Sequence, residues 1–211
     1  MSGFSITYEA DIPPGARVLV PGGMSSPHAI ATGVYHDGSL IETVTEENTG
    51  QTALVVEGRG ERLSLRFNFD DAQGTDYPEA MFRLHASRHT RTARSLIDEV
   101  SGIAPDEGDA SRALAIARAT ALRFTYGHPE SRFTDGHDQI PALGCGLTEG
   151  SCVDINTYFI ASLRAAGIET GYVTGYYFPD EKGDWCEDGH CWIVTRTEAG
   201  LQEWDIAHHL K

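Results

Sequence analysis

The sequence predicts an α+β fold, with an antiparallel β domain followed by a domain of helices and a second antiparallel sheet. Two observations support this prediction. From Phe4 to about Asp71, apolar residues tend to recur at every second position, as they do in strands with one buried face. After this region the apolar residues recur at helical spacing, before the C-terminal part returns to β-rich runs. We therefore predict an N-terminal β-rich, sandwich-like domain at residues 1–75 and a second domain at residues 76–211.

The size and charge of the chain exclude some classes of protein. At 211 residues, the chain can bury an apolar core without help from a metal or a disulfide. Its 31 acidic and 16 basic residues give a net charge of -15, which argues against nucleic acid or an anionic membrane surface as partner. The sequence shows neither a secretory signal nor an apolar run of roughly 20 residues. We therefore expect a cytoplasmic protein with reduced thiols.

The clearest strand of the first domain is the stretch RLSLRFNFD. Its apolar residues alternate with polar ones, so one face should be buried: Leu63, Leu65, Phe67 and Phe69. The turn signals PPG, PGG, HDG and EENTGQ separate the other candidate strands of this domain. Their spacing favours an antiparallel meander or a small sandwich.

Helical signals begin after the linker DDAQGTDYP. The stretch YPEAMFRLHASRHTRTARSLIDEV is compatible with helix, and DASRALAIARATALRFTYG predicts a helix more clearly. We expect Asp109 or Ser111 to be the N-cap of the second helix and Gly127 to close it. Its apolar face is expected to comprise Leu114, Ala117, Ala121 and Leu122.

Cys152 lies where a third helix is expected to begin, directly after Gly150 and Ser151. The apolar face of this helix is expected to comprise Ile155, Phe159, Ile160 and Leu163, with Gly167 as its C-terminal stop. At a helix N-terminus, unpaired backbone N–H groups and the helix dipole lower a thiol pKa below its usual value of about 8.5. Most intracellular cysteines are simply small buried residues, but this position makes Cys152 a candidate nucleophile. Asp154 is expected to stabilise the first turn of the same helix.

A thiolate nucleophile needs a base and a group that orients the base. The stretch GHCWIVTR predicts a strand in which His190 and Trp192 share one face while Cys191 points the other way, as a packed small residue. In a third strand, Asp205 could accept the second ring N–H of His190 if the register brings the two together. His208, near the C-terminus, is expected to be solvated.

The cysteines leave other interpretations open. A structural zinc site could use five residues: Cys145, Cys152, Cys186, His190 and Cys191. Their spacings, C-x6-C and C-x3-H-C, differ from the paired C-x2-C that is typical of zinc knuckles. A disulfide between Cys186 and Cys191 is disfavoured among reduced thiols. A non-catalytic binding module on the same fold is a third interpretation.

From about Ala110 to Ile206 the chain resembles the transglutaminase-like superfamily. The resemblance is carried by GSCVDINTYFIASLRAAGIETGYVTGY, GHCWIV and EWD, which occur in this order. Within the superfamily, the chain is most similar to the bacterial and archaeal group of transglutaminase-like cysteine proteases. The sequence IAHHLK stands where relatives often carry D-P. The resemblance implies a papain-like core, in which the helix with the cysteine packs on an antiparallel sheet that carries the histidine and the aspartate.

On this resemblance Cys152 is the nucleophile, His190 the general base and acid, and Asp205 the orienting carboxylate. The implied reaction is acyl transfer from an amide through a thioester, with the backbone N–H of Cys152 as one oxyanion donor. Water as acceptor makes a cysteine peptidase or amidase, which we favour. An amine as acceptor makes a transglutaminase or an amide-forming acyltransferase.

The resemblance implies a peptide, a protein or a small amide as substrate. We expect no cofactor, and the sequence has no acidic loop with the ligand spacing of a calcium site. The polar loop FPDEKGDWCEDG is the expected determinant of specificity, because it joins two strands near the mouth of the site. The residues indicate neither a second oxyanion donor nor an oligomeric state.

Overall fold

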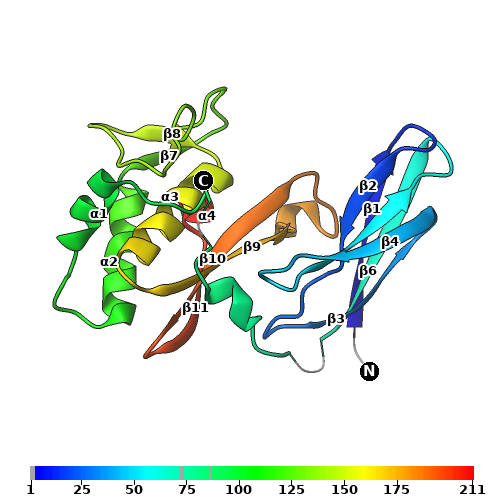
Figure 1. Ribbon diagram of the computed structural model, residues 1–211, viewed down its shortest axis with the longest axis horizontal. Helices are drawn as coiled ribbons and strands as arrows, with labels where there is room; N and C mark the ends of the chain where they lie inside the picture. The colour runs from blue at the N-terminus through cyan, green and yellow to red at the C-terminus, as the bar shows by residue number, and fades with distance from the viewer. Residues whose placement is uncertain (1–2, 72–73, 86) are drawn as a thin grey trace. The chain divides into compact units, whose positions relative to one another are not determined.

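A computed structural model describes residues 3–71, 74–85 and 87–211 of the chain (Figure 1). The chain divides into two compact units, Met1–Ala80 and Met81–Lys211, whereas the sequence placed the boundary after residue 75. No helix within the described ranges is long and apolar enough to cross a membrane.

The first unit consists of two three-stranded antiparallel sheets. Its strands are β1 (Gly3–Asp11), β2 (Arg17–Pro21), β3 (Ile30–His36), β4 (Ser39–Thr45), β5 (Thr52–Glu57) and β6 (Arg62–Asp70). One sheet has the order β1-β6-β3 and the other β2-β5-β4. Val20 and Val56 of the second sheet form one buried cluster with Leu63 and Leu65 of β6, as the alternation in β6 predicts. The two sheets therefore pack face to face around a small apolar core.

The remaining elements combine helices with a second antiparallel sheet (Figure 1). They are η1 (Glu79–Phe82), α1 (Arg94–Ser101), α2 (Asp109–Ala121), β7 (Phe124–Tyr126), β8 (Thr148–Gly150), α3 (Cys152–Ala165), β9 (Glu169–Tyr176), η2 (Asp180–Lys182), β10 (Gly189–Thr197), β11 (Gly200–Trp204) and α4 (Ile206–His209). The sheet has the order β11-β10-β9, and α3 packs against β9 and β10. Helices α1, α2 and α4 contact the other sides of α3, so α3 is the central helix of this unit.

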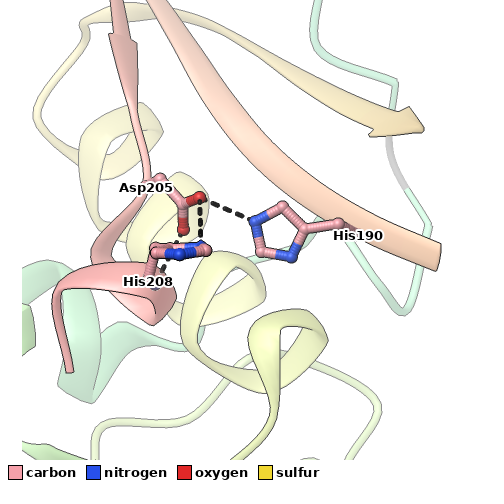
Figure 2. Close-up of side chains that lie close together, drawn as sticks. All are labelled: His190, Asp205 and His208. Atoms are coloured by element: carbon pink, nitrogen blue, oxygen red, sulfur yellow. Dashed lines mark hydrogen bonds and ion pairs between the residues drawn. The ribbon is translucent and has the colours of Figure 1, made fainter. Parts of the chain in front are cut away.

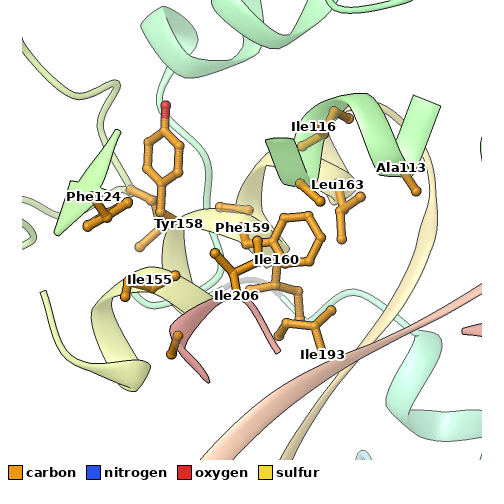
Figure 3. Packing of buried hydrophobic residues seen from close by; sticks show 14 of the residues in the cluster. Ala113, Ile116, Phe124, Ile155, Tyr158, Phe159, Ile160, Leu163, Ile193 and Ile206 are labelled. Carbon is orange, nitrogen blue, oxygen red and sulfur yellow. The ribbon is translucent and has the colours of Figure 1, made fainter. Parts of the chain in front are cut away.

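The core of the second unit forms around α3 (Figure 3). Ile155, Phe159 and Leu163 are each 0% exposed, which confirms the apolar face predicted for this helix. Ile193 of β10 and Ile206 of α4 belong to the same buried cluster. The helix ends where predicted, because Gly167 adopts the positive φ of 83° that a helix stop requires and that other residues rarely tolerate.

Helix α2 departs from its prediction. The expected buried residues Leu114 and Leu122 are 41% and 76% exposed. Of the predicted face, Ala117 is buried and Ala121 packs against the core, as expected. The other buried residues of the helix are Ala113, Ile116 and Thr120. Small residues on this face let α2 approach α3 closely, and that partner decides which face is buried.

Both predicted ends of α2 were wrong as well. Its N-cap is Gly108. A residue far along the chain stabilises its first turn, because the carboxylate of Glu198 accepts a hydrogen bond from the backbone N–H of Ala110 at 3.2 Å. The helix stops at Ala121 rather than near Gly127. The β-prone residues that follow form β7, which pairs in parallel with β8 just before Cys152.

Candidate active site

Cys152 is the first residue of α3 and is 9% exposed. Asp154 Oδ2 accepts hydrogen bonds from the backbone N–H of Ser151 at 3.0 Å and from its hydroxyl at 2.7 Å, so Asp154 stabilises the first turn as expected. The first backbone N–H groups of a helix have no partner within the helix. The N–H of Cys152 therefore lies where it can donate to a group bound beside its own thiol.

His190 and Asp205 form a close pair, with 2.7 Å between His190 Nε2 and Asp205 Oδ2 (Figure 2). His190 lies near the start of β10. Asp205 lies one residue beyond β11 rather than within it, and it is the N-cap of α4, where its Oδ1 accepts from the backbone N–H of His208 at 2.9 Å. The pairing of Ile193 with Trp204 sets this register and brings Asp205 within reach of His190.

Hydrogen bonds couple the protonation of these side chains. Those from Cys191 and His190 hold the pKa of Cys152 well below its ordinary value, although burial opposes the shift. The hydrogen bond to Asp205, followed by that to Cys152, raises the pKa of His190 to about 9. Burial alone would raise the pKa of Asp205, but the hydrogen bonds from His190 and from the His208 backbone lower it. These shifts favour a thiolate, an imidazolium and a carboxylate at neutral pH.

Cys191 was expected on the opposite face of β10 from His190, as a packed small residue. It is buried as expected, but the structure also brings it to Cys152, which was not predicted. The alternation itself holds, since the rings of His190 and Trp192 stack with centroids 6.4 Å apart. Cys191, however, is 2% exposed and hydrogen-bonds to Cys152. Helix α3 covers the face of β10 that carries Cys191, so the side chain directed away from Trp192 is directed towards the helix that bears the nucleophile.

Asn156 fixes the position of Cys191. It lies one turn after Cys152 on α3 and is 0% exposed. Its Nδ2 donates to the backbone carbonyl of Cys191 at 2.8 Å and also contacts Cys191 Sγ at 3.5 Å. The hydrogen bond with Cys152, together with burial, raises the pKa of Cys191. Cys191 therefore remains a neutral thiol whose S–H donates to the thiolate of Cys152.

An open cleft of about 270 Å³ lies beside the His190–Asp205 pair. Its lining residues are Tyr176, Tyr177, His190, Trp192, Glu203, Trp204 and Asp205. The predicted specificity loop contains η2 and runs from β9 to β10, the two strands that carry Tyr176 and His190. Trp185 in this loop is 56% exposed, whereas Trp192 contributes to the cleft as well as packing on His190.

The contacts of His208 and Asn156 with the site were not predicted from the sequence. His208 was expected to be solvated, but its ring lies 4.3 Å from the ring of Tyr177 and 5.9 Å from that of His190. The spacing of Asp205 and His208, three residues apart across a helix start, is a signal that could have indicated this contact. An asparagine one turn after Cys152, within an apolar helix, is a similar signal.

The structure does not support the cysteine zinc site or the disulfide. All four cysteines are free thiols, of which Cys145 is exposed and Cys186 is partly exposed. Among the described residues, the histidine, cysteine and acidic side chains close enough to hold a metal ion are His190, Asp205 and His208, and no cysteine belongs to this group. Cys152 and Cys191 face each other in the core instead, which leaves Cys145 and Cys186 without the partners that a zinc knuckle needs.

A central helix that begins at Cys152 and packs on an antiparallel sheet that carries His190 is the arrangement of a papain-like core. Comparison with known proteins identifies the family. The family model of the transglutaminase-like superfamily matches residues 94–204, just over half of the 211 residues. The chain therefore belongs to the transglutaminase-like superfamily, a family of cysteine-dependent enzymes.

Two solved structures are also similar to the chain. The crystal structure of a candidate cysteine protease from Cytophaga hutchinsonii matches with a TM-score of 0.56 at 12% identity, over 98% of this chain and 79% of that chain. The periplasmic domain of TgpA from Pseudomonas aeruginosa matches with a TM-score of 0.46 at 14% identity, over 97% and 87% of the two chains. No curated protein matches the chain. The first likeness concerns the fold alone, and with the family match it confirms the predicted α+β class.

Proposed function

We propose that Cys152, His190 and Asp205 act as a catalytic triad that hydrolyses an amide bond, so that the protein is a cysteine peptidase or amidase. The observation that carries this proposal is the position of His190 between the other two residues. Its Nε2 bonds to Asp205 at 2.7 Å, while its other side interacts with Cys152. A base that contacts both a nucleophile and an orienting carboxylate is the arrangement that thiol catalysis needs.

Each residue has a defined step in the proposed reaction. The thiolate of Cys152 attacks the carbonyl carbon of the amide, and the backbone N–H of Cys152 donates to the oxyanion that forms. His190 then gives its Nδ1 proton to the departing amine, the C–N bond breaks and a thioester remains. A water molecule, deprotonated by His190, attacks the thioester and releases the acid. Asp205 holds the ring through Nε2 during both steps.

Water is the proposed acceptor because the cleft beside His190 is open and carries His190 and Asp205 on its wall. A transglutaminase or amide-forming acyltransferase would use the same triad with an amine in place of water. We propose a peptide, a protein or a small amide as the acyl donor.

A thiol probe tests the nucleophile without knowledge of the substrate. We expect iodoacetamide at pH 6 to label Cys152 in preference to Cys145, which is exposed and free. At this pH an ordinary thiol is ionised to only about 0.3%. Replacing His190 with alanine should abolish the preference, whereas His209→Ala, the exposed neighbour of His208, should preserve it. Equal labelling of the two cysteines in the unaltered protein would contradict the proposal.

The acceptor is tested with a library of peptides and amides in the presence of a primary amine. Mass spectrometry distinguishes the two outcomes, because hydrolysis yields the free acid and transamidation yields the new amide. We expect the free acid as the main product. The reaction should disappear in Cys152→Ala.

A further inference from the structure

His208 carries a ring nitrogen that the proposed hydrolysis does not use. Its Nδ1 is buried and makes no hydrogen bond to any residue in the described part of the chain. The same nitrogen lies 3.7 Å from Asp205 Oδ2 and points towards the His190–Asp205 pair (Figure 2). A buried ring nitrogen that makes no hydrogen bond destabilises the folded state, so its position favours a ligand.

The arrangement around this nitrogen fits a small divalent cation. The ligand atoms of His190, Asp205 and His208 all lie within 4.8 Å of one another. In a tetrahedral zinc site with bonds of about 2.0 to 2.1 Å, neighbouring ligand atoms are about 3.3 Å apart. Two of the distances here, 2.7 Å and 3.7 Å, lie on either side of that value.

The ligands are also held in place before any cation binds. The second oxygen of Asp205 accepts from the backbone N–H of His208 at 2.9 Å, so the carboxylate directs Oδ2 towards both imidazoles. Tyr177 packs edge-on against the ring of His208 at 4.3 Å and restricts its rotation. Such contacts around a ligand set reduce the ordering that metal binding requires.

We propose that His190, Asp205 and His208 bind one Zn²⁺ ion at the wall of the cleft, where the metal replaces the proton shared by His190 and Asp205. Two imidazoles and one carboxylate suit zinc, whereas calcium and magnesium prefer all-oxygen sites. The open cleft of about 270 Å³ gives the ion access and leaves room for a water molecule as fourth ligand. The net charge of -15 also favours a cation over an anion.

Metal binding would have a consequence for the proposed function. A zinc ion on His190 Nε2 displaces the proton that this nitrogen shares with Asp205, and the ring can then no longer act as an imidazolium beside Cys152. The zinc form should therefore lose the enhanced thiol reactivity. This consequence rests on the proposed triad, whereas the binding of zinc itself does not.

The experiment is a titration of Zn²⁺ into the full chain by calorimetry, in a Cys145→Ser and Cys186→Ser background that removes the two more exposed thiols. We expect one equivalent to bind. His208→Gln should weaken the affinity at least tenfold, while His209→Gln, its exposed neighbour, should leave it unchanged. Circular dichroism and thermal unfolding of each variant show whether it is folded, and His190→Gln provides a second ligand variant.

Substituting Cys152 with serine separates this proposal from the proposed function. Zinc binding should persist in Cys152→Ser, even if the triad proves inactive. Loss of binding in this variant would place the metal on the thiol and overturn the proposal. Equal affinity in folded His208→Gln, or no binding below millimolar zinc in the background protein, would overturn it as well.

Discussion

Replacing Asp205 with asparagine tests the electrostatics of the pair directly. Asparagine keeps the shape of the side chain and is a good N-cap, so the start of α4 is preserved while the charge is lost. The pKa of His190 is raised from 6.5 to about 9, and its side chain is only 10% exposed. This rise corresponds to about 3 kcal/mol in favour of the protonated form. Because Asp205 makes the largest contribution, we expect Asp205→Asn to lower the pKa of His190 by more than about one unit.

The assay is a histidine NMR titration of the unaltered protein and the variant. A raised pKa of His190 stabilises the folded state fully below pH 6.5, and this stabilisation is lost as the pH rises through about 9. In Asp205→Asn the loss should be complete at a lower pH, because only the folded-state pKa of His190 changes. Glu203→Gln is the matched control, because it removes the same charge from another residue of the cleft wall, whereas the charges that contribute most to the pKa of His190 are those of Asp205 and Cys152. The reasoning would be refuted if the pKa of His190 stayed near 9 in Asp205→Asn, or fell equally in the control.

Two further substitutions test the surroundings of the nucleophile and the core. Cys191→Ala removes a hydrogen bond to a charged group, commonly worth about 1.5 to 3 kcal/mol, so the pKa of Cys152 should rise by about 1 to 2 units. The pH dependence of alkylation measures this shift, and an unchanged midpoint, or the same shift in Cys145→Ala, would count against the hydrogen bond. Phe159→Ala should lower the free energy of unfolding by about 3 to 5 kcal/mol in urea, because its ring is 0% exposed. Leu122→Ala, at a residue that is 76% exposed, should change it by less than about 0.5 kcal/mol, and a similar loss in both variants would contradict the assignment of the core.

The helices show what a local pattern can and cannot predict. In α3 the large residues Ile155, Phe159 and Leu163 lie on one stripe and the helix is central, so its buried face was predicted correctly. In α2 the large Leu114 is exposed and the small Ala113 is buried, because close packing against α3 favours small residues at the contact. Hydrophobicity alone ranks these two residues in the wrong order. Only the position of the partner helix corrects the ranking.

The candidate site was also predicted only in part from the sequence. Chain order and strand alternation were enough to nominate Cys152, His190 and Asp205, since each lies at the start or end of an element with a clear signal. The role of Cys191 depended on which face of β10 the helix covers, and a single sequence contains no signal for that choice. The contact of His208 depended on Asp205 ending the strand and capping α4, which brings a residue three positions later back towards the site.

These contacts explain how one thiol can be held as a thiolate within a largely apolar core. Strand β10 supplies His190 from one face and Cys191 from the other, and Cys152 at the N-terminus of α3 hydrogen-bonds to both. The charged imidazolium is held by Asp205, while the neutral Cys191 is held by Asn156 from the helix that carries the nucleophile. The hydrogen bond between His190 and Asp205 and the one between Asn156 and Cys191 are therefore independent of each other. Asp205 follows the last strand of the sheet, whereas Asn156 lies on α3. Loss of Asp205 should impair proton transfer by His190, whereas loss of Cys191 should chiefly change the basicity of Cys152.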